Sequence, residues 1–86
     1  MSQLSQLKQQ INSIGEDAKS TAQGLSTFKS KFSRSVGQVS ATIGGSAQQV
    51  DRKMIQTLQA AEKQVDAAIA ALQQASSAAR SYSASL

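Results

Sequence analysis

Both halves of this 86-residue chain carry apolar residues at alternating spacings of three and four, on either side of the dipeptide Gly44-Gly45. This spacing places the apolar residues in one stripe along an α-helix, which is typical of a helix that packs lengthwise against another helix. The first stripe comprises Leu4, Leu7, Ile11, Ile14, Ala18, Thr21, Leu25, Phe28, Phe32 and Val39. The second comprises Met54, Leu58, Ala61, Val65, Ala68, Leu72, Ala75, Ala79, Tyr82 and Leu86. The pattern predicts an all-α fold of two long helices.

The glycine pair predicts where the chain reverses. Glycine adopts positive φ angles without a Cβ penalty and commonly follows the last residue of a helix. No proline interrupts either half. We therefore expect one domain, a two-helix antiparallel, coiled-coil-like hairpin, with its hinge residues at Ile43, Gly44 and Gly45. Its expected segments are a first helix over about residues 3–42, a hinge at 43–46 and a second helix over about 47–83.

A reversal centred on the glycines predicts which side chains face each other across the hairpin. It sets Ile14 opposite Ala75 and Phe28 opposite Ala61, so that large side chains meet small ones and the helices pack without voids. The seam residues expected from this register are Leu7, Ile11, Ile14, Leu25, Phe28, Phe32, Leu58, Val65 and Leu72.

Further apolar residues lie outside these stripes and suggest a surface for a partner. A two-helix unit buries little apolar area and is marginally stable alone. Ile55 and Ile69 fall beside the second stripe, so we expect them to bind a partner. Gly15 and Gly24 flank the first stripe. They indicate either the close approach of a partner helix or a locally weak helix, and the sequence leaves both interpretations open.

The chain is basic, with a formal net charge of +4. Folding at the glycines would gather five basic residues toward the hinge end of the rod, where their potential attracts anionic partners. These basic-tip residues are Lys29, Lys31, Arg34, Arg52 and Lys53. A basic module that binds an anionic membrane surface or nucleic acid is therefore an alternative function. Nucleic acid is the weaker choice, because Phe28 and Phe32 are expected on the seam and leave no ring exposed for base stacking.

The composition argues against catalysis. The chain has no His and no Cys, which removes the commonest general base and the thiolate nucleophile. Glu62 and Asp66 share a helix face, but they have no third ligand nearby, so we expect no metal, cofactor or small-molecule substrate. No segment approaches the roughly 20 apolar residues that span a bilayer, and the N-terminus lacks a signal-peptide pattern. We expect a cytoplasmic protein that, if exported, leaves without a cleaved signal.

A helical hairpin of this length with Ile43-Gly44-Gly45 at the hinge resembles the Trp-x-Gly family of small type VII secretion proteins. Ile43 stands where the family has Trp, and Gly45 matches its glycine. The resemblance implies dimers packed as four-helix bundles and export without a cleaved signal. The family's export signal, a Tyr followed four residues later by an acid, would begin at Tyr82, but Leu86 stands at the fourth position.

This departure implies that a partner supplies the export signal, as for the small helical adaptors of LXG-type toxins. We therefore expect a non-catalytic adaptor or targeting partner for type VII secretion. Its expected partner is a helical protein, either the N-terminal domain of an LXG-type toxin or a second small hairpin.

Overall fold

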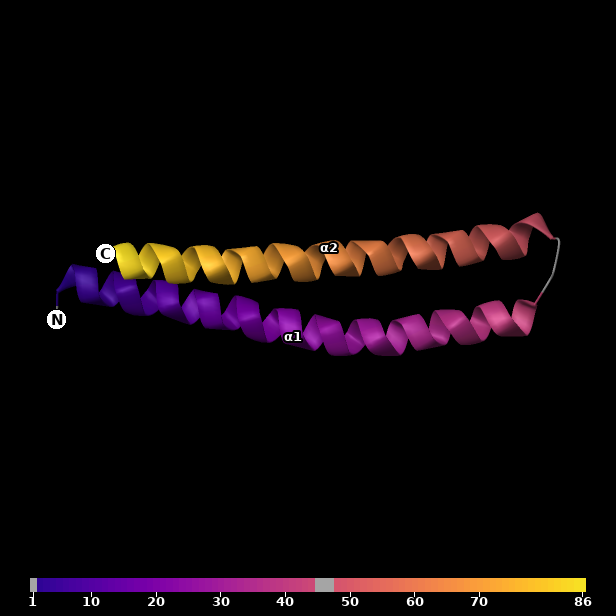
Figure 1. Ribbon diagram of the computed structural model, residues 1–86, viewed down its shortest axis with the longest axis horizontal. Helices are drawn as coiled ribbons and strands as arrows, with labels where there is room; N and C mark the ends of the chain where they lie inside the picture. Colours follow the sequence, from indigo (N-terminus) through magenta and orange to yellow (C-terminus); the bar gives the residue numbers. More distant parts are fainter. Residues whose placement is uncertain (1, 45–47) are drawn as a thin grey trace.

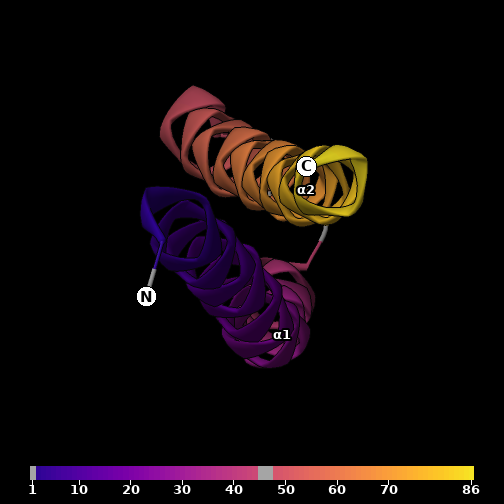
Figure 2. The ribbon, with the colours of Figure 1, turned by 90° about the vertical axis from the view of Figure 1, so that its left-hand side faces the viewer.

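The computed structural model describes residues 2–44 and 48–86 and confirms the all-α hairpin. Helix α1 spans Gln3–Ile43 and helix α2 spans Gln49–Ser85. They lie side by side in opposite directions and form a rod of 65 × 17 × 14 Å (Figure 1). Viewed along the rod, the two helices are inclined to each other (Figure 2).

The helix ends differ from the expected ones by one or two residues. The side-chain oxygen of Ser2 accepts a hydrogen bond from the Ser5 backbone N–H at 3.1 Å, which caps the start of α1. Ile43, expected in the hinge, is instead the last residue of α1. Gly44 follows with φ of 64°, a positive value that favours glycine. The remaining predicted hinge positions, Gly45 and residue 46, lie outside the described residues.

Apart from Ser33 and Ser40, which lie beside it at e positions, the buried and half-buried residues of both helices follow a regular heptad pattern that identifies the seam. In α1, with Gly15 at heptad position a and Ile11 at d, the seam is Ile11, Gly15, Ala18, Ala22, Leu25, Lys29, Phe32, Val36, Val39 and Ile43. In α2, with Ile55 at a and Leu58 at d, it is Asp51, Ile55, Leu58, Glu62, Val65, Ile69, Leu72, Ser76, Ala79, Ser83 and Leu86. Both helices thus meet through a and d positions, as in a coiled coil.

Each predicted stripe consists of two columns, that is, two sets of residues at the same heptad position along the helix. Only one of these two columns lies on the seam. From Ile11 onward the predicted d residues lie on the seam, whereas Leu4 near the start of α1 is exposed. The second predicted column occupies the g positions, which lie on the other side of d. Three of the expected seam residues are consequently exposed: Leu7, Ile14 and Phe28. The error has a physical reason, because Gly15, Ala22 and Ser76 let the backbones come close although they add little to an apolar stripe.

The register also differs from the expected one. We expected Phe28 opposite Ala61, yet the next residue, Lys29, forms an ion pair with Asp66. Helix α2 is therefore displaced toward the hinge relative to a reversal centred on Gly44-Gly45. The start of α1 accordingly extends past the end of α2 (Figure 1). The cause is the connection itself, since α1 ends at residue 43 and α2 begins only at residue 49.

Small residues bring the helices closest in the half of the rod that holds the chain ends. A Cβ atom added to Gly15 would lie 3.1 Å from the Cβ of Ala79 and 3.6 Å from the backbone oxygen of Ser76. Of the two interpretations of Gly15, the structure supports close approach, but the helix that approaches is α2 of the same chain.

This contact yields a cross-linking prediction. The double variant Gly15→Cys with Ala79→Cys should form a disulfide within one molecule, because its Cβ atoms lie near the roughly 3.5–4.5 Å separation of natural disulfides. Mass spectrometry and non-reducing gels of the oxidised protein measure the product. The pair Ile14→Cys with Ala75→Cys should not close within one molecule. If that second pair closes as readily as the first, the a/d register is wrong.

Two adjacent residues of α1 test which column is buried. Ala22 is 3% exposed at an a position, whereas Thr21 is exposed at the neighbouring g position. Ala22→Asp buries an unpaired carboxylate at a cost of about 3 kcal/mol or more, which lowers the Tm by about 12 °C or more. Thr21→Asp should leave the melt, followed by circular dichroism, nearly unchanged. Equal losses from both substitutions would contradict the assignment.

Candidate partner-binding surface

One long side of the rod carries the large apolar residues that the hairpin leaves exposed. Ile14 is 64% exposed and Phe28 is 50% exposed. Both lie at g positions, as do Leu7 on α1 and Met54 and Tyr82 on α2, which are also exposed. Between the two g columns lie the d residues, which are only half-buried. We call the g and d positions of both helices the open face.

The pockets of the rod establish that the g positions of the two helices share one side. Ser35 and Thr42 of α1 line the same pocket as Met54 of α2, and all three are g residues. The e positions behave likewise on the other side, where a polar pocket of about 250 Å³ includes Lys19 of α1 and Arg80 of α2. The rod therefore has an apolar side at g and a polar side at e.

Charged side chains are segregated in the same way. The c positions lie next to the g columns at the edges of the open face. Of the nine basic and five acidic residues in the chain, only Asp17 and Lys31 lie at g or c positions, and both are on α1. The c and g positions of α2 carry none. A depletion of charge beside exposed large apolar residues is the composition of the core of a protein interface.

An aromatic pair lies near the middle of the open face. The rings of Phe28 and Phe32 are stacked, with centroids 5.6 Å apart and an interplanar angle of 19°. Phe32 occupies a half-buried d position, and the exposed Phe28 ring lies against it from the g column. Aromatic pairs contribute beyond their buried area, and large aromatic side chains dominate interface energetics. This pair therefore gives the open face a rigid apolar centre.

The residues predicted to bind a partner lie mostly elsewhere. Ile55 and Ile69 occupy a positions and are half-buried against α1, so their assignment to an outward surface is wrong. Gly15 is buried within the seam. Gly24 alone among these four residues is exposed, at a c position on the edge of the open face, with nothing within 4 Å of an added Cβ.

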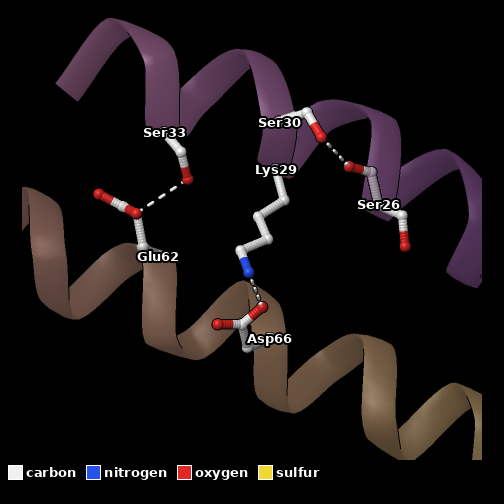
Figure 3. Close-up of polar contacts among 6 residues, drawn as sticks. All are labelled: Ser26, Lys29, Ser30, Ser33, Glu62 and Asp66. Carbon is white, nitrogen blue, oxygen red and sulfur yellow. Dashed lines mark hydrogen bonds and ion pairs between the residues drawn. The ribbon is translucent and has the colours of Figure 1, made fainter. Parts of the chain in front are cut away.

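The residues predicted to form a basic tip differ in their surroundings. Lys29 lies in the seam at an a position, where its Nζ is 2.6 Å from an oxygen of Asp66 (Figure 3). Nearby, the Ser33 hydroxyl donates a 2.9 Å hydrogen bond to Glu62 of α2 (Figure 3). The other predicted tip residues, Lys31, Arg34, Arg52 and Lys53, are exposed.

These polar contacts between the helices act on alignment more than on stability. The side chains of Lys29 and Asp66 are 38% and 51% exposed, and ion pairs of such exposure contribute about 0–1 kcal/mol. Polar residues at a positions nonetheless specify register, because any other alignment leaves them among apolar side chains. Lys29 and Glu62 both occupy a positions, so they favour the observed alignment.

Neither a metal site nor a membrane-spanning segment is found in the part of the chain that the structure describes. Glu62 and Asp66, which share a helix face, contact α1 across the seam. No group of three or more potential metal ligands occurs in residues 2–44 and 48–86. Neither of the two described helices has an apolar stretch long enough to cross a bilayer. The chain matches no protein-family model, no curated protein and no solved structure.

The open face could have been found in the sequence from a different signal. The g and d columns contain the most large apolar residues, so a count of apolar residues assigns these two columns to the seam. The absence of charge at the g and c positions of α2 marks the same surface independently. Since a hairpin seam needs only two columns per helix, the third apolar column, with Ile14, Phe28 and Met54, is the one that the hairpin leaves uncovered.

Gly24 offers a stability test of its surroundings. Gly24→Ala should stabilise the free hairpin by about 0.5–1 kcal/mol, because alanine is the better helix former and the added methyl meets nothing. Gly15→Ala should gain less, because its methyl is pressed against Ala79. Urea denaturation of the two variants compares their free energies of unfolding. A larger gain at Gly15 than at Gly24 would contradict the close packing described for Gly15.

Proposed function

We propose that this protein is a non-catalytic helical adaptor that binds a larger helical protein through its open face. The observation that carries the proposal is the apolar side of the rod, centred on Phe28, which carries few charged residues. Exposed apolar residues such as Ile14 and Tyr82 are individually ordinary on a protein surface. Their alignment in columns along both helices, beside half-buried d residues, supports a surface that a partner helix covers.

We further propose that the partner belongs to type VII secretion, as a toxin of the LXG type or a sister hairpin. The resemblance of Ile43-Gly44-Gly45 to the Trp-x-Gly hinge supports this assignment, together with the all-α hairpin itself. In this role the protein performs no chemistry. It covers the apolar helices of its client and presents the joint assembly for export.

The experiment is co-purification from the native host with wild-type and substituted protein. The double variant Ile14→Gln with Phe28→Gln should retain helicity, because both side chains already lie outside the seam. Burial of a large apolar side chain contributes roughly 1.5–3 kcal/mol. Loss of two should therefore weaken binding of the native partner by about a hundredfold or more. The dissociation constant is measured with the purified partner by calorimetry.

The matched control places the same new side chain one residue earlier at each site. Ser13→Gln with Thr27→Gln lies at f positions, away from the open face, and should bind like the wild type. Binding in about 1 M salt should also persist, since apolar contacts are not screened. Binding that survives the Ile14 and Phe28 substitutions, or that salt abolishes, would argue against the proposal and favour a basic, phosphate-binding module.

A further inference from the structure

The open face ends in a pocket near the hinge that is open to solvent. The pocket has a volume of about 480 Å³ and is lined by Val39 and Ile43 of α1, Met54 of α2, and the polar residues Ser35, Gln38, Thr42 and Asp51. We call it the hinge-end socket. Its volume falls within the roughly 300–1,000 Å³ of sites that hold small organic molecules. It is therefore large enough for a bulky side chain rather than a single methyl group.

The socket follows from how side-chain size is distributed along the seam. Toward the chain ends the helices meet through Gly15, Ser76 and Ala79, which permit close approach. Toward the hinge the seam carries larger residues, among them Val36 and Ile43. These hold the backbones further apart, and the g side chains at this end include Ser35 and Thr42, which are too short to fill the space between the helices.

We propose that the hinge-end socket receives one large apolar side chain from the partner helix that lies on the open face. This inference rests on the proposed function, because it assumes that a helix covers this face. The chemistry of the walls selects the occupant. The side chains of Val39, Ile43 and Met54 offer apolar contact, and the carboxylate of Asp51 in the lining disfavours an acidic guest.

The socket would act as the anchor of the interface. Most of the open face is a shallow surface of g and d side chains, on which contacts are individually weak. A side chain that enters this pocket loses more of its contact with water than one that lies on the shallow surface, and such anchored residues carry most of the binding energy at interfaces. The socket also fixes the axial position of the partner helix, because only one of its turns can supply the anchor.

Indole serves as a probe of the socket in the isolated protein. Methyl-labelled protein titrated with indole should show saturable NMR shifts of the Val39, Ile43 and Met54 methyl groups, with a millimolar dissociation constant typical of a small fragment. The methyl groups of Leu7 and Ile14, exposed on the same face but outside the socket, should not respond. Shifts spread evenly over the open face, or no saturable shift, would overturn the proposal.

A pair of matched substitutions distinguishes binding in the socket from non-specific attraction to an apolar surface. Thr42 lines the pocket, and Thr21 lies in the same g column three heptads earlier, outside it. Thr42→Phe should fill the socket, abolish the indole shifts and weaken binding of the native partner about tenfold or more. Thr21→Phe adds the same ring to the same face but outside the socket, and it should leave the indole shifts unchanged. Tighter binding by both variants would show general hydrophobic attraction and overturn the socket.

The outcomes separate this inference from the proposed function. If Thr42→Phe binds the partner normally while Ile14→Gln with Phe28→Gln does not, the socket is wrong and the adaptor function stands. If neither set affects partner binding, the proposed function fails, and with it the role of the socket. Self-association of the wild type that Thr42→Phe alone abolishes, measured by light scattering, would assign the socket to a second copy and overturn a partner helix as its occupant.

Discussion

Close contact between the helices at Gly15 decides how the rest of the molecule is arranged. A Cβ atom at this position would lie only 3.1 Å from the Cβ of Ala79, so the absence of a side chain at Gly15 lets the two backbones pack closely. This approach turns the a positions of both helices inward. Because each helix is rigid, the choice extends over its whole length and leaves the g positions outside.

The polar residues of the seam are consistent with this rotation. Lys29 and Glu62 occupy a positions, and their partners, Asp66 and Ser33, lie at the e positions beside them. A helix pair rotated toward d and g would separate these groups and bury Phe28 and Ile14 instead. Compared with packing through d and g, the observed arrangement buries less apolar side-chain surface but packs the backbones closely and satisfies the polar groups of the seam. The apolar surface that remains exposed is available to a partner.

The rod consequently has two unlike sides. The e side is polar and carries Lys19 and Arg80 around a small pocket. The g side is apolar, nearly free of charge, and ends in the hinge-end socket. In the adaptor function that we propose, a partner helix covers the g side and no reaction is catalysed. The specificity of the adaptor would then reside in the axial fit of a partner helix along one side.

The sequence by itself determined the two long helices, their antiparallel pairing and the turn after Ile43, since these follow from local spacing, the absence of proline and the conformational freedom of Gly44. The d residues of the seam, such as Leu25 and Leu72, were also determined by the sequence.

The sequence did not determine the second column of the seam, which is formed by the a residues, or the register of the two helices. Three adjacent columns in each helix consist largely of apolar or small residues, and periodicity alone cannot say which two face the other helix. Only tertiary packing decided this, because the advantage of Gly15 lies in the backbone contact that it permits and not in its own hydrophobicity. The same decision moved the candidate binding surface from Ile55 and Ile69 to the open face.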